Sequence, residues 1–191
     1  MTVPSSAPAL ADRYWIVALV RAAVALIAAA IITFSADHSA PLGLVVFGGF
    51  ALATGIVSGV GALAVVDRVL RGLHIAQGVF GIIAGVSALV LHGSGLGVLL
   101  YAVSVWAALT GFAELYCGLR VRSRSTVSRD WLVAGGLTAI LAIVYLAIPP
   151  DSVLAVGLFG AYAAVIGVYV GIGAFSLKWA GTTHETAGNN A

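Results

Sequence analysis

The sequence predicts an all-α, polytopic membrane protein with six transmembrane helices built as three parallel helical-hairpin repeats. Three observations predict this fold class: the composition, the lengths of the apolar runs and a recurring spacing. Of the 191 residues, 61% are hydrophobic and only 8% are charged, whereas soluble domains carry roughly 25% charged residues. The mean hydropathy is +1.11. The chain therefore lacks the polar surface that a soluble domain needs.

Six segments are long and apolar enough to cross a bilayer, which takes about 20 residues for about 30 Å of hydrocarbon. They lie at about 14–34, 42–66, 71–91, 96–119, 131–148 and 152–177, with short connections rich in Gly, Pro, Ser and Asp. We expect one membrane domain at 14–178, with hairpins at 14–66, 71–119 and 131–177. The polar ends at 1–13 and 179–191 are expected to be disordered cytoplasmic tails.

Basic side chains gather on one side of these segments. Arg13, Arg68, Arg71, Arg120, Arg122, Arg124, Arg129 and Lys178 flank that side, and the opposite loops carry Asp37, His38, His92 and Asp151 without Lys or Arg. Cytoplasmic loops of membrane proteins are enriched in Lys and Arg. The distribution predicts a multi-pass protein with both termini in the cytoplasm.

A spacing of 56 residues indicates the repeat. It separates Phe50, Trp106 and Tyr162, then Ala51, Ala107 and Ala163, and then Gly55, Gly111 and Gly167. "RAAVALIA" from Arg21 aligns with "QGVFGIIA" from Gln77 at the same offset, and "GGLTAILA" from Gly135 needs a shift of two. The repeats are parallel. The inverted repeats of many transporters are absent from this pattern, which disfavours an alternating-access carrier.

The repeated aromatic-Ala-x-x-x-Gly block, the short outer turns and the Arg-rich inner ends resemble the HdeD-type short-repeat membrane proteins. The most similar stretch is "VWAALTGFAELYCGLRVR" from Val105, and Arg21 stands where such proteins often carry an Arg before a small residue. The resemblance covers about 14–178. It implies a six-helix protein of the bacterial cytoplasmic (inner) membrane, in a family with one member associated with acid resistance, and it implies no reaction or ligand.

Three polar side chains are predicted to form a layer inside the membrane. At 1.5 Å per residue, Arg21, Gln77 and Glu114 each lie about 9–10 Å from the basic side. One interpretation is structural: Arg21 and Glu114 neutralise each other and Gln77 supplies further hydrogen bonds. The other interpretation is functional: the three side chains take part in a proton- or ion-transfer step near the inner face. The structural interpretation is favoured because polar residues do not continue outward, as a conduction path would require.

Further candidates are small, titratable or basic. Small residues at i and i+4 let helices approach closely, either within the chain, which is favoured, or at a seam with a partner protein. They are Gly55, Gly59, Gly81, Gly85, Gly167 and Gly171.

His38 and His92 are either pH-responsive groups of the outer face or turn residues. His74 is expected to snorkel or cap near Arg71. Four arginines set the topology or bind anionic lipid head groups: Arg120, Arg122, Arg124 and Arg129.

No motif predicts catalysis. "HGSG" from His92 to Gly95 lacks the leading glycine of a rhomboid protease, and the sixth segment has no His to activate Ser94. The single Cys117 excludes an intramolecular disulfide and a Cys-based zinc site. We therefore expect a non-enzyme without metal or cofactor.

The function expected from these residues and the resemblance is that of an HdeD-type, stress- or acid-resistance-related protein. It would act through contacts with membrane lipids or proteins, in a homo-oligomer or a larger complex, and not with nucleic acid. The alternatives are an accessory or assembly subunit of a larger bacterial membrane complex and a small-solute or proton permease.

Overall fold

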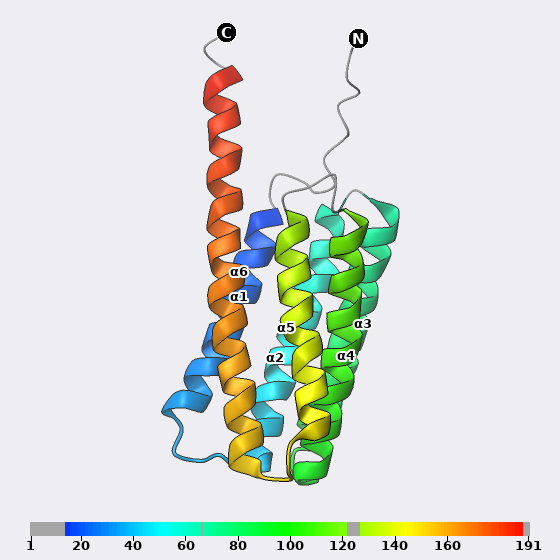
Figure 1. The fold of residues 1–191 in the computed structure, drawn as a ribbon, viewed down its shortest axis with the longest axis vertical. Coiled ribbons are helices and arrows are strands. Elements are labelled where there is room, and N and C mark those ends of the chain that lie inside the picture. Colours follow the sequence, from blue (N-terminus) through cyan, green and yellow to red (C-terminus); the bar gives the residue numbers. More distant parts are fainter. Residues whose placement is uncertain (1–13, 66, 122–126, 189–191) are drawn as a thin grey trace.

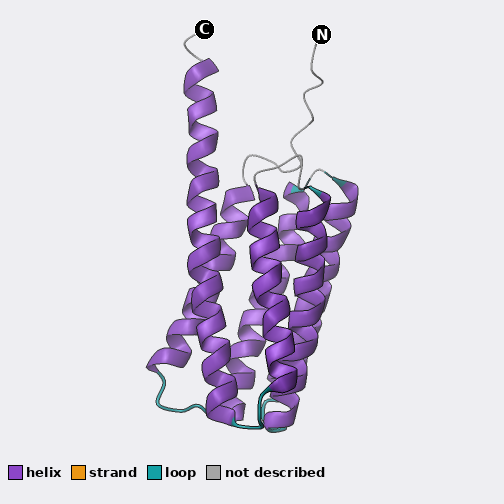
Figure 2. Cartoon of the chain, viewed as in Figure 1, coloured by secondary structure: helices purple, strands orange, loops and turns teal. Residues whose placement is uncertain are grey.

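The computed structural model describes residues 14–65, 67–121 and 127–188, and these form six α-helices and one short 3-10 turn (Figures 1 and 2). The elements are α1 (Tyr14–Phe34), α2 (Ala40–Gly61), η1 (Ala62–Ala64), α3 (Arg68–Val90), α4 (Leu96–Arg120), α5 (Val127–Ala147) and α6 (Ser152–Gly188). All six helices are long and apolar enough to cross a membrane. The predicted all-α, polytopic membrane fold is confirmed.

Short polar residues cap the starts of α2, α3 and α6. The Ser39 hydroxyl accepts a hydrogen bond from the backbone N–H of Leu42 at the start of α2. Asp67 accepts from the first N–H groups of α3, and Asp151 accepts from the backbone of Leu154 in α6. These caps satisfy N–H groups that have no partner inside the helix. Gly95, before α4, has φ 87°, a conformation that glycine adopts without steric cost.

The start of α1 and the end of α6 lie at one end of the bundle, here named the terminal end, and the α1–α2, α3–α4 and α5–α6 turns lie at the opposite turn end (Figure 1). Arg13, Arg122 and Arg124 lie outside the described residues. The segment from 179, predicted to be a disordered tail, continues α6 as far as Gly188, and this part of the helix projects past the bundle (Figure 1). Adding a residue to an existing helix gains one hydrogen bond without a new nucleation cost.

The closest helix pairs are α2–α3, α4–α5 and α6–α1, and the two helices within each expected hairpin pack less closely. A Cβ atom built on Gly55 would lie 2.8 Å from the backbone nitrogen of Ile82, and one on Gly111 would lie 2.7 Å from that of Ala139. A Cβ on Gly167 would lie 2.9 Å from the Leu26 side chain. Equivalent glycines thus open equivalent seams, which is compatible with three repeats. Ala139, which Gly111 meets on α5, follows Ile82, which Gly55 meets on α3, by 57 positions. The alignment of Gly135 with Gln77 predicts an offset of 58.

Aromatic rings from α2, α4 and α6 fill the centre of the bundle. Phe50 and Trp106 meet edge to face with their centroids 5.4 Å apart, and Trp106 meets Tyr162 at 6.4 Å. The rings named here as the aromatic layer are Phe47, Phe50, Trp106, Phe159 and Tyr162. The aromatic residues of the three repeats therefore meet at one place, where they fill the cross-section between the helices.

Candidate functional site

The predicted partners Arg21 and Glu114 form an ion pair between α1 and α4, in which Arg21 Nη2 donates to Glu114 Oε1. The Glu114 side chain is 4% exposed and the Arg21 side chain 19%. A charge that has lost most of its contact with water is stable in a protein interior only when a partner neutralises it. The contact therefore corresponds to the structural interpretation of the polar layer.

Gln77 lies at the same level but binds elsewhere. Its Nε2 atom donates to the backbone carbonyl oxygen of Thr110, at 3.3 Å. The structure shows no direct hydrogen bond between Gln77 and the ion pair within its described residues. The Gln77 amide therefore joins α3 to α4 by a hydrogen bond. It does not make the hydrogen bonds to the Arg21–Glu114 pair that the sequence predicts.

Hydroxyl groups that the sequence analysis missed complete this layer. Thr54 donates to the carbonyl oxygen of Phe50 at 2.7 Å, and Ser58 and Thr110 are both buried. The repeat spacing could have located them, because Ser58 precedes Glu114 by 56 residues and Thr54 precedes Thr110 by the same number.

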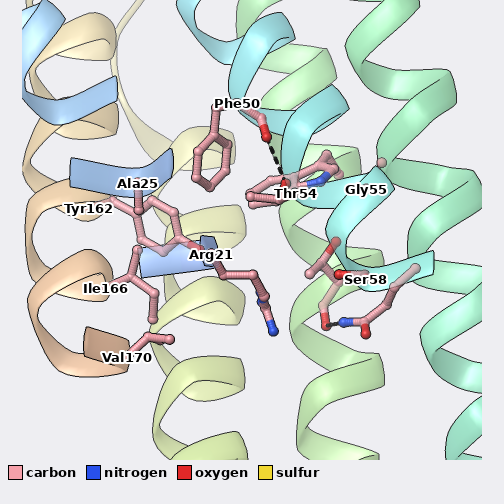
Figure 3. Close-up of a pocket in the computed structure, with 13 residues that line it drawn as sticks. Arg21, Ala25, Phe50, Thr54, Gly55, Ser58, Tyr162, Ile166 and Val170 are labelled. Atoms are coloured by element: carbon pink, nitrogen blue, oxygen red, sulfur yellow. Dashed lines mark hydrogen bonds between the residues drawn. The ribbon is translucent and has the colours of Figure 1, made fainter. Parts of the chain in front are cut away.

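A cavity of about 30 Å³ lies among these groups (Figure 3). Arg21 extends into it from α1, with Ser58 on the α2 side and Tyr162 and Val170 on the α6 side (Figure 3). We name it the central cavity. Its mixed lining could hold water or a molecule of similar size.

A second cavity of about 40 Å³ lies nearer the terminal end, between α1, α5 and α6. Tyr14 and Asp130, near the starts of α1 and α5, line it together with Leu177 of α6. Arg21 and Val170 line both cavities. We name this space the terminal cavity, and the shared lining shows that the two cavities adjoin at these two residues.

Tyr14, His74 and Trp131 form a hydrogen-bonded cluster at the terminal end. His74 Nδ1 lies 3.0 Å from the Leu70 carbonyl oxygen, which only accepts, so this nitrogen carries the proton. The Tyr14 hydroxyl then donates to His74 Nε2 and accepts from Trp131 Nε1, both at 3.2 Å. His74 is 3% exposed. The expectation of a snorkelling or capping histidine is wrong, because Tyr14 supplies a buried partner for its ring.

The predicted small residues lie at seams within the chain. Gly81 faces Gly55, Gly85 faces Leu52, and a Cβ on Gly171 would lie 3.6 Å from that of Ala22. Gly59 provides the backbone that a Cβ on Gly78 would meet at 3.0 Å. These contacts correspond to packing within the chain, the interpretation that the sequence favoured.

The remaining candidates lie at the two ends. His92 is exposed and its Nδ1 lies 3.0 Å from the Leu89 carbonyl oxygen, as in a turn, and His38 is half-buried. Arg120 and Arg129 are exposed at the terminal end, with Arg120 Nε 4.0 Å from Asp67 Oδ1. The other two predicted lipid-binding residues, Arg122 and Arg124, lie outside the described residues.

The described residues contain no group of three or more His, Cys, Asp or Glu side chains placed to hold a metal ion. Ser94 lies in a turn, where its backbone N–H donates to the Leu91 carbonyl oxygen. The site is therefore a paired charge with cavities beside it. Comparison of the chain with protein-family models, with curated proteins and with solved structures found no match.

Proposed function

We propose that this integral membrane protein is a non-enzymatic, HdeD-type protein of the bacterial cytoplasmic membrane with a role in stress or acid resistance. It acts through contacts with lipids or other membrane proteins, and both of its termini are cytoplasmic. One observation carries the proposal: the Arg21–Glu114 pair neutralises itself, and the aromatic layer fills the bundle on its turn-end side. Within the described residues the interior offers no continuous polar path, and we infer that the protein acts through its outer surface.

That surface suits lipid contact. Large apolar side chains are exposed along the helices, as at Ile27, Phe112 and Ile172. At the terminal end the surface becomes basic, and Lys178 lies 5.0 Å from the centre of the Trp15 ring. Interfacial aromatic residues and cations are typical of contact with anionic head groups.

Deletion of the gene tests the stress role. We expect the deletion strain to survive an acid challenge less well than the wild type, with restoration by the intact chain. Equal survival of the two strains would overturn the stress role. Purification in mild detergent followed by mass spectrometry tests the mode of action: lipid or further copies of the chain support the proposal, and a stoichiometric foreign subunit favours the accessory-subunit alternative.

The central cavity beside Arg21 is the observation that favours a permease as the second candidate. Its test is flux in proteoliposomes. Solute or proton flux that disappears in Glu114→Gln would favour the permease and overturn the surface-acting proposal. An equal rate in protein-free liposomes, wild type and Glu114→Gln would support that proposal.

A further inference from the structure

Two buried residues, Ser58 and Thr110, contribute hydroxyl groups to the lining of the central cavity. Ser58 and Thr110 are 6% and 8% exposed, and within the described residues neither hydroxyl makes a hydrogen bond to the protein. Because no fully buried polar atom there lacks a partner, both hydroxyls face space that water can reach. The Nη2 atom of Arg21 donates a hydrogen bond to Glu114, and the other N–H groups of the guanidinium make no hydrogen bond within the described residues. A buried polar group without a partner is costly, and ordered water usually supplies the missing bond.

The size of the cavity fits water. Space of about 10–15 Å³ of this kind holds one water molecule, and the central cavity measures about 30 Å³. Two water molecules therefore fit between Arg21, Ser58 and Thr110. A water molecule in this position would have the two to four polar partners that buried water requires.

The lining of the two cavities indicates the end of the bundle from which solvent reaches this space. Toward the terminal end, the terminal cavity begins at Arg21 and Val170 and extends to the half-exposed Asp130 at the start of α5. Toward the turn end, the aromatic layer and the fully buried Leu44, Val103 and Val156 fill the bundle. Along the bundle axis, the linings of the two cavities therefore lead from the pair toward the terminal end.

We propose that Arg21, Ser58 and Thr110 form a binding site for about two water molecules, and that these molecules exchange with solvent only through the terminal cavity. The Arg21–Glu114 pair is then hydrated from the terminal end. The inference does not depend on the stress role, because it concerns only the route by which water reaches the buried pair.

Thiol accessibility tests the proposal in the full chain. Cys117→Ala removes the native thiol, and Ser58→Cys then places one thiol in the central cavity. Arg68→Cys and Gly93→Cys mark the terminal and turn ends, and Val103→Cys is a matched buried control on the turn-end side of the pair. Right-side-out and inverted vesicles receive Ag⁺, a small thiol-reactive probe, in chloride-free buffer. Thiols left free are counted with a maleimide polymer after denaturation.

We expect Ser58→Cys to react at least about tenfold faster from the side that modifies Arg68→Cys than from the side that modifies Gly93→Cys, because thiol reactivity depends on access. Val103→Cys should stay unmodified from both. Equal rates from the two sides, a faster rate from the Gly93 side, or a rate as low as that of Val103→Cys would each overturn the proposal.

Val170 provides a second test. Val170→Phe, added to Ser58→Cys, should abolish the reaction because it fills the junction of the cavities, and Val165→Phe on the exposed face of α6 should not. Unchanged modification with Val170→Phe would overturn the route. If the Ser58→Cys protein does not fold, Val170→Cys takes its place. We again expect faster modification from the side that modifies Arg68→Cys, and equal rates, a faster rate from the Gly93 side or a rate as low as that of Val103→Cys would again overturn the proposal.

Discussion

Arg21 on α1 and Glu114 on α4 are 93 positions apart in the sequence and form an ion pair inside the membrane-spanning part of the bundle. The two helices belong to different repeats and to different closely packed pairs. The ion pair therefore joins parts of the bundle that the glycine seams leave separate.

Removing one charge should cost more than removing both. Glu114→Gln leaves the Arg21 cation without its partner, and we expect a loss of about 3–5 kcal/mol, the usual cost of breaking a buried pair. Arg21→Met with Glu114→Met should lose less, and the exchange Arg21→Glu with Glu114→Arg should recover part of the loss. Thermal unfolding in detergent measures this. Equal midpoints for all variants would contradict the pairing.

The glycine seams should not tolerate a methyl group. Gly55→Ala places a Cβ 2.8 Å from the backbone of Ile82, and we expect a loss of about 1–3 kcal/mol from overpacking. Gly49→Ala, on the same helix, has open space within 4 Å and gains up to about 1 kcal/mol of helix propensity. The comparison is made by thermal unfolding. A Gly55→Ala protein as stable as Gly49→Ala would mean that α2 and α3 are less close than described.

The cluster at the terminal end should depend on one hydroxyl. Tyr14→Phe leaves both Trp131 Nε1 and His74 Nε2 without their shared partner. We expect a loss of about 1–3 kcal/mol. Tyr101→Phe is the matched control, because Tyr101 is 72% exposed, and it should unfold like the wild type. If the two substitutions lowered the unfolding midpoint equally, the cluster would not stabilise the fold.

The turn before α4 should require glycine at position 95 but not at position 93. Gly95 has φ 87° and ψ −175°, and Gly95→Ala is expected to cost about 1–3 kcal/mol of backbone strain. Gly93→Ala lies in open space and should be neutral. Denaturation in detergent distinguishes them, and a neutral Gly95→Ala would show that the turn adopts another conformation.

Much of the fold follows from local properties of the sequence. All six helices lie where hydropathy and turn residues predict them, although α5 begins at Val127 instead of near 131 and α6 continues to Gly188. The depths of Arg21 and Glu114 could be predicted because each helix residue advances the chain by a constant rise. The hydrogen bond of Gln77 to the Thr110 backbone could not, because it depends on how two helices rotate toward each other.

The sequence by itself determined the membrane class, the six spans, the common side of the basic residues and the 56-residue spacing. These depend on composition and on counting along one chain. Only the tertiary structure decided that α6 closes against α1, that His74 binds Tyr14 and that two cavities meet at Arg21 and Val170. Each of these depends on the rotation and separation of helices distant in sequence, which side-chain packing sets and hydropathy does not encode.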